Sequence, residues 1–198
     1  FSLDFARLLY GGHAGQEPLF FASQDGGIVP SEGGCMLVLE RRDDALARKA
    51  RIYARLGAMT LGRAKHAPAL RGALDRLLAK QNLTMKGVGL ASSGQTGAAL
   101  AQDLAEQTLW QSLGADCPPL AAARSLTGEA ESMAGLAQVA LAAQALNEGS
   151  APPVWRAAPD TALPVLRARQ PVRGAALVTA LDGAGNHALL TLSQERAA

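Results

Sequence analysis

The segment from Glu131 to Asn147 is the feature that most constrains how this chain folds. It contains six alanines, three leucines, a valine and a methionine, and its interior polar side chains are Gln138 and Gln144. A helix that is apolar on most of its circumference belongs inside a large protein. The two glutamines, and a length below the roughly 20 residues of a membrane span, argue against a transmembrane helix. The sequence therefore predicts a buried helix, with a preceding turn that brings Glu129 to the positive end of its dipole.

The composition is that of a globular protein or part of one. Of 198 residues, 48% are hydrophobic and 18% are charged, as expected if another polypeptide covers part of the surface. The net charge is +2, and the lysines and arginines are scattered along the chain instead of forming a basic patch, which argues against nucleic-acid binding. Cys35 and Cys117 lack the spacing of a metal site, so we expect no metal, no cofactor and a reducing, cytoplasmic location. Because the chain opens at Phe1 rather than Met, we expect a processed or partial polypeptide.

Strand and helix patterns alternate along the chain and end in a hairpin. Continuous apolar runs predict buried strands, and leucines at helical spacing predict amphipathic helices. A turn over 182–186 joins the last two strands. The pattern predicts an α/β fold whose mixed sheet has helices on both faces. The expected strands are 35–39, 51–59, 87–91, a short one after 118, 175–181 and 188–192; the expected helices are 3–10, a charged one within 40–50, 69–81, 98–113 and the central one; and 147–165 is expected to be irregular.

Four passages, in order, resemble the β-ketoacyl-acyl-carrier-protein synthase family. The strongest is GIVPSEGG followed by CMLVLERRDDALARKARIYARL, which is similar to that family's glycine-rich turn, strand and helix. SSGQTGAALAQDLAEQ falls on the family's HGTGTPLGD, RSLTGEAESMAG on KSNIGHTLGAAG, and ALDGAGNHALLTL on SFGFGGTNASLVL. The resemblance implies a thiolase-like layered fold with two similar halves. Residues 1–65 would then end the N-terminal half, and residues 66–198 would form the C-terminal half.

The resemblance implies that the catalytic groups of this family are missing. Its two histidines match Ser93 and Glu129, and its lysine matches Arg124. A serine cannot replace a neutral imidazole as donor and acceptor, and an ionised glutamate repels an enolate. Arg124 keeps the positive charge, and we expect it to pair with Glu129 or Glu131. The family's cysteine nucleophile would lie upstream of Phe1.

The remaining candidate residues are interpreted mainly as structural. The phenylalanine of the family's GFGG loop is matched by Asp182, while Gly183 and Asn186 keep the character of that loop. All three residues are candidates for a substrate-tunnel or oxyanion loop. If the family matching is right, this loop should converge with the segments of Ser93 and Glu129 around one pocket. Cys35 and Cys117 are expected to be packing residues. The histidines His13, His66 and His187 fall on no catalytic position, and His187 is kept in reserve because it follows the hairpin turn.

Three functions remain open from the sequence. The first is a non-catalytic subunit of the chain-length-factor kind, which pairs with an active β-ketoacyl synthase and acyl carrier protein in fatty acid or polyketide synthesis. The second is the later part of a condensing or acyl-transfer enzyme with altered chemistry. The third is a binding or structural module on the same scaffold. A homo- or heterodimer, without nucleic acid or membrane, is expected.

Overall fold

Five strands form one mixed sheet in the computed structural model, which describes residues 18–23, 27–64 and 66–195. The strand order is β1-β7-β6-β2-β3. β1 pairs antiparallel with β7, and β7 with β6, whereas β2 runs parallel to both β6 and β3. β6 and β7 form the predicted hairpin. The strands of this sheet are β1 (Arg55–Arg63), β2 (Val88–Ser93), β3 (Leu120–Ala122), β6 (Ala175–Leu181) and β7 (Asn186–Ser193).

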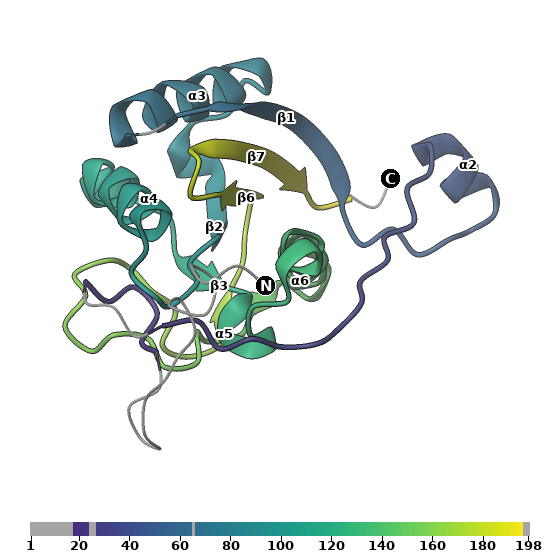
Figure 1. Ribbon diagram of the computed structural model, residues 1–198. Helices are drawn as coiled ribbons and strands as arrows, with labels where there is room; N and C mark the ends of the chain where they lie inside the picture. The colour runs from purple at the N-terminus through teal and green to yellow at the C-terminus, as the bar shows by residue number, and fades with distance from the viewer. Residues whose placement is uncertain (1–17, 24–26, 65, 196–198) are drawn as a thin grey trace.

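Helices lie on both faces of this sheet (Figure 1). The connections between them carry three short 3-10 turns and a two-stranded ribbon of β4 and β5. The helices are α2 (Arg42–Ala47), α3 (Ala67–Lys80), α4 (Ala101–Ser112), α5 (Arg124–Thr127) and α6 (Ala134–Glu148); the 3-10 turns are Met85–Gly87, Gly114–Asp116 and Glu131–Met133; and the ribbon joins Ser150–Ala151 to Gln170–Pro171.

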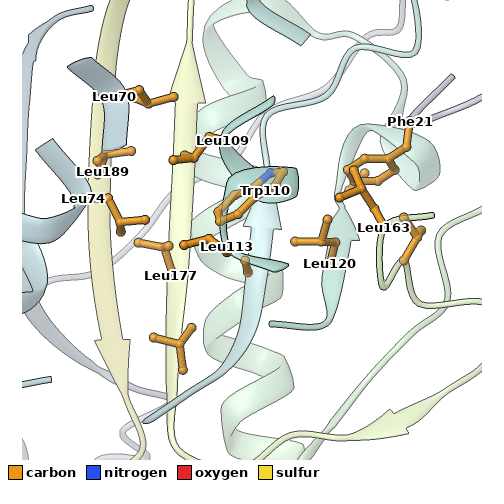
Figure 2. Close-up of a cluster of buried hydrophobic side chains, with 14 of the residues drawn as sticks. Phe21, Leu70, Leu74, Leu109, Trp110, Leu113, Leu120, Leu163, Leu177 and Leu189 are labelled. Carbon is orange, nitrogen blue, oxygen red and sulfur yellow. The ribbon is translucent and has the colours of Figure 1, made fainter. Parts of the chain in front are cut away.

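The first face of the sheet is covered by α3 and α4. Their large side chains pack on Leu177 of β6 and Leu189 of β7, and Figure 2 shows Trp110 of α4 at the centre of this cluster. The buried leucines of α3 follow the helical spacing seen in the sequence, at 70, 74, 77 and 78. This side of the molecule is therefore a large, closed hydrophobic core.

The second face carries α6, the predicted central helix. Successive residues of a strand point to opposite faces, so Ala176 and Val178 of β6 meet α6 while Leu177 meets α4. The side of α6 that touches the sheet is built mainly from alanines and brings the helix close to the strands. Burial is incomplete, since Leu136 on α6 is 43% exposed. The prediction of a helix against the core is confirmed, and its outward side is open in the described chain.

The prediction of a buried strand over 35–39 is wrong. This segment has no strand pairing, and Met36 is 88% exposed and Val38 82% exposed. A strand needs a hydrogen-bonding neighbour. The five strands of the sheet pair among themselves, away from the extended segment before β1 that contains residues 35–39, which is called the arm below (Figure 1). The apolar run is real, but nothing in the described chain lies beside it as a strand.

The other predicted elements are confirmed with shifted ends. The strand expected at 51–59 is β1 and begins four residues later, at Arg55. The short strand after residue 118 is β3, and the charged helix is α2. The segment 147–165 begins with the last two residues of α6 and is otherwise irregular apart from β4 and isolated bridges. The helix expected at 3–10 lies outside the described residues.

Candidate functional site

Ser93 ends β2, and its neighbour Gly94 is held from two sides. The Gly94 amide donates to Oε1 of Glu106 at 3.2 Å, and its carbonyl oxygen accepts from Nη1 of Arg124. Ser93 is fully buried. A β-carbon at Gly94 would lie 3.0 Å from the carbonyl oxygen of Thr179, so β6 leaves no easy room for a side chain there. The position that matches the family's first histidine is therefore a closed turn.

Arg124 and Glu129 form an ion pair beside this turn. Nε of Arg124 lies 2.6 Å from Oε2 of Glu129, and the two side chains are only 12% and 10% exposed. The pairing predicted from the sequence is confirmed. A pair so little exposed is screened weakly by solvent, and breaking it would leave a charge in a poorly solvated place. The carboxylate that the sequence analysis assigned to the second histidine position is thus held by the guanidinium that it assigned to the lysine position.

The Glu129 backbone ties this ion pair to the glycine-rich passage near the start of the described chain. Its amide donates to the carbonyl of Val29 at 2.9 Å, and its carbonyl accepts from the amide of Ser31 at 3.0 Å. Gly128 makes the approach possible: it has a φ of +71°, and a β-carbon there would lie 2.8 Å from the β-carbon of Ser31. Two passages with family resemblance, far apart in sequence, therefore meet at Glu129.

The candidate loop residues Asp182, Gly183 and Asn186 form the exposed turn between β6 and β7. Oδ1 of Asp182 accepts from the amides of Ala184 and Asn186, and Oδ2 accepts from the side-chain amide of Asn186 at 2.7 Å. The side-chain hydrogen bond from Asn186, followed by the backbone amides, lowers the pKa of Asp182. The contacts of these side chains stay within the turn. The structure brings Ser93, Arg124 and Glu129 together and leaves these three residues to close the hairpin.

A buried polar network behind Gly94 was not predicted from the sequence. Glu106 of α4 also accepts from the Thr179 hydroxyl and from Nε2 of Gln95. Asp103, one turn earlier, accepts from the amide and the hydroxyl of Thr96. The available signal was spacing, because residues 103, 106 and 107 lie on one face of a helix. Asp, Glu and Gln on the same face indicate that the face is either exposed to solvent or buried against polar partners.

Burial changes the acidity of both carboxyls. Desolvation raises the pKa of Glu106 to about 7, against hydrogen bonds led by that from Thr179. It also raises the pKa of Asp103, where the bonds from Thr96 act in the opposite direction. The donors to Glu106 are the Gly94 amide, the Gln95 side-chain amide and the Thr179 hydroxyl, which are neutral, so among the described residues no hydrogen-bonded cation offsets its charge.

The cysteines and histidines of the described chain lie apart from the Arg124–Glu129 pair. Cys35 and Cys117 form no disulfide, and burial raises the pKa of Cys117 to about 11, so this thiol stays protonated. His66 caps the start of α3 by accepting from the amide of Ala69. His187 is buried on the α3 side of β7, and burial followed by the charge of Arg76 lowers its pKa. His13 lies outside the described residues.

A groove of about 690 Å³ separates the arm before β1 from α6. Its walls are largely apolar, and arginines of the arm stand along its rim. The apolar lining includes Leu37, Ile52, Tyr53, Val139, Ala143 and Leu192. The groove adjoins the open side of α6 and is far larger than the small cleft between α5, α6 and β3.

Two classes of feature are missing from the part of the chain that the structure describes. Among these residues no three His, Cys, Asp or Glu side chains are grouped so as to bind a metal ion. Within the same residues, every helix is too short or too polar to cross a bilayer.

Comparison with known proteins identifies related sequences and folds. The model of the "Beta-ketoacyl synthase, C-terminal domain" family matches residues 53–157, just over half of the chain. The "Granaticin polyketide putative beta-ketoacyl synthase 2" of Streptomyces violaceoruber is 34% identical over 162 residues, which are 78% of this chain and 39% of the relative. The chain thus spans less than half of this relative.

Solved structures show the same thiolase-like fold. "The ishigamide ketosynthase/chain length factor" matches with a TM-score of 0.81 at 23% identity, over 94% of this chain and 49% of that one. A structure of "AntDE:AntF", described as a type II acyl-carrier protein in complex with its ketosynthase, matches with a TM-score of 0.80 at 21% identity, over 96% and 51%. A β-ketoacyl synthase from Burkholderia phymatum matches with 0.81 at 18% identity, over 98% and 51%. The predicted fold class is confirmed.

Proposed function

Because the chain belongs to the β-ketoacyl synthase family, we propose that it is the later part of a non-catalytic subunit of the chain-length-factor kind. In this proposal it pairs with an active β-ketoacyl synthase and serves acyl carrier protein in polyketide or fatty acid synthesis, in the cytoplasm. The division at residue 65 is part of the proposal, with β1 leading the chain from the first half into the second.

The observation that carries the proposal is the ion pair at the family's catalytic positions. A ketosynthase needs neutral donors where negative charge develops on the enolate oxygen. By the proposed matching, the carboxylate of Glu129 takes one histidine position, 2.6 Å from Arg124, and the buried Ser93 takes the other. The positive charge of Arg124 is already used by Glu129 and by the Gly94 carbonyl. These contacts support a structural and not a catalytic role for Ser93, Arg124 and Glu129 in this chain.

The open apolar surface supports the presence of a partner. Met36 and Val38 are each more than 80% exposed, and both line the groove beside α6. Contiguous exposed apolar surface of this kind is typical of interfaces. Two of the similar solved structures are a ketosynthase with a chain length factor and a ketosynthase with its acyl-carrier protein. Those partner types are the ones we propose here.

The first test is the mass of the purified native complex, followed by the masses of its denatured components. We expect a second, different polypeptide in stoichiometric amount, with a cysteine nucleophile of its own. A stable lone 20.4 kDa species would contradict the pairing. If a nucleophilic cysteine were instead found upstream of Phe1 in the same polypeptide, the altered-enzyme alternative would replace this proposal.

A second test separates a catalytic from a structural role. In the complex, condensation of acyl and malonyl carrier proteins should be abolished by replacing the partner's cysteine. Glu129→Gln should retain condensation to within a few-fold once the folded fraction is taken into account. A loss of 100-fold or more, in the range that catalytic acids and bases contribute, would show that Glu129 takes part in the chemistry. Asp75→Asn on the exposed side of α3 is the matched control, because it also neutralises a carboxylate paired with an arginine.

A further inference from the structure

The Gly94 peptide joins a buried carboxyl to a charged pair. On its amide side is Glu106 of α4, and on its carbonyl side is Arg124 of α5. Arg124 extends the connection to Glu129 at 2.6 Å. One peptide group therefore lies between two ionisable systems that come from different parts of the chain.

The surroundings of Glu106 are neutral on each element packed against it, except for one carboxyl and one more distant cation. β2 presents the Ser92 carbonyl and the Ser93 side chain, and the turn after it presents Gln95. β6 presents Thr179, whose carbonyl also accepts from Gln138 of α6 at 3.1 Å. On its own helix Asp103 faces the same region, and its carboxyl feels the charge of Arg124.

Two hydrogen-bond patterns are available around Oε1 of Glu106. In the charged form, the Thr179 hydroxyl and the Gly94 amide both donate to this oxygen. In the neutral form, Oε1 can donate its proton to the Thr179 hydroxyl, which in turn donates to the carbonyl of Ser92, 3.4 Å away. The amide of Gly94 then meets an uncharged oxygen, and a hydrogen bond to a neutral acceptor is weaker than one to a carboxylate.

We propose that Glu106, Gly94 and Arg124 form a proton-sensitive clamp, in which protonation of Glu106 loosens the Gly94 turn and so changes the hold of Arg124 on Glu129. The Thr179 hydroxyl connects the two forms, because it donates a hydrogen bond to Glu106 when the carboxyl is charged and accepts one from it when the carboxyl is neutral. The clamp is a property of the buried network, so it holds or fails independently of the proposed function of the subunit.

The clamp requires that the Glu106 carboxyl gain or lose its proton near neutral pH. Burial raises the pKa of Glu106 to about 7, so both forms are populated near neutral pH. An exposed glutamate would be charged throughout this range, and the turn would then be held in one state.

The test is a pH titration of the full protein labelled with ¹⁵N at glycine and arginine, followed by NMR over roughly pH 5.5 to 8.5. We expect the Gly94 amide and the Arg124 Nε signals to shift together with one midpoint, near 7. Both shifts should vanish in Glu106→Gln, which keeps the shape of the side chain. A Gly94 signal that does not titrate, or that titrates equally in Glu106→Gln, would overturn the proposal, as would an Arg124 signal that does not follow it.

Two further variants keep the test decisive if Glu106→Gln fails to fold. Thr179→Val removes the hydrogen bond that most lowers the pKa of Glu106, so the shared midpoint should move up. Asp103→Asn removes a negative charge that raises the same pKa, so the midpoint should move down while the titration persists. Movement in the opposite directions, or no movement in either variant, would assign the titration to another group and refute the clamp.

Discussion

Both faces of the sheet carry a cluster of buried apolar residues, and yet the two faces differ in how far they are covered. On the α3 and α4 side, Leu74 and Trp110 are fully buried in a closed core. On the α6 side, Met59 and Leu61 of β1 remain more than half exposed, and a large groove lies between α6 and the arm before β1. An apolar pattern in the sequence thus predicts that a surface is buried. It does not predict whether residues of the same chain or of a partner bury it.

The strongest way to break this comparison is a pair of identical substitutions, one on each face. Leu74→Ala should lower the free energy of unfolding by about 2–5 kcal/mol, because it opens a cavity in the closed core. Leu61→Ala, at a side chain that is 67% exposed, should change it by less than about 0.5 kcal/mol in the separated chain. Urea denaturation monitored by circular dichroism measures both.

The same pair tests the proposed partner. In the complex, Leu61→Ala should acquire a measurable loss of stability or affinity, whereas the effect of Leu74→Ala should stay as it was. Equal effects of the two substitutions in the separated chain would contradict the difference between the faces.

The second comparison concerns Thr179, where both faces place a polar group against β6. From the α4 side comes the ionisable Glu106, and from the α6 side the neutral Gln138. The pKa of Glu106 is raised from its ordinary 4.5 to about 7, so the unfolded chain ionises first as pH rises. Stability should therefore fall by roughly 3 kcal/mol between about pH 4.5 and 7 and level off above that.

Glu106→Gln should remove most of this decline, with a remainder from Asp103, whose pKa is also raised. Gln138→Met should lower stability by about 1 kcal/mol at every pH, since it removes a neutral hydrogen bond. Unfolding curves at a series of pH values distinguish the two. An unchanged slope in Glu106→Gln would mean that Glu106 is charged in the folded protein as well.

The sequence predicted the elements whose partners lie within the chain. The leucine spacing of α3 and the turn residues of the β6–β7 hairpin are local signals, and each was enough to place its element. The run at 35–39 has the composition of a buried strand, but pairing is a long-range property, and no described strand lies beside it. Composition therefore predicts strand potential, whereas the sheet depends on which neighbours are present.

The candidate site was predictable in part for the same reason. Arg124 and Glu129 are five residues apart and of opposite charge, so their pairing followed from the sequence and the resemblance. Glu106 was missed because its donors come from the turn after β2 and from β6, and the link to Thr179 spans 73 positions. Buried carboxyls in an amphipathic helix are the signal to look for, since they are rare without partners.

Ion pairs give a third comparison between a covered and an exposed site. Arg124→Met should lower the free energy of unfolding by about 2–4 kcal/mol, because it leaves Glu129 and the Gly94 carbonyl poorly solvated without their cation. Arg71→Met removes an arginine from a pair with Asp75 on the surface of α3, where the side chains are 40% and 55% exposed. Its effect should be below about 0.5 kcal/mol. Equal effects at matched pH and salt would mean that solvent reaches both pairs alike.

The smallest expected effect concerns His187, which sits on the α3 side of β7. Burial and the charge of Arg76 lower its pKa below the ordinary 6.5, so the folded state favours the neutral ring. As pH falls below 6.5, the unfolded chain binds a proton first, and the contribution of His187 to stability is lost. His187→Gln should therefore flatten the acid side of the stability curve between about pH 6.5 and 5.

Thr191→Val, on the same strand and face, is the control: it loses a hydrogen bond to the Ala58 carbonyl and should keep the acid-side slope. A slope unchanged in His187→Gln would mean that the ring is protonated within the fold and that the α3 face, closed to water elsewhere, admits a charge at this point.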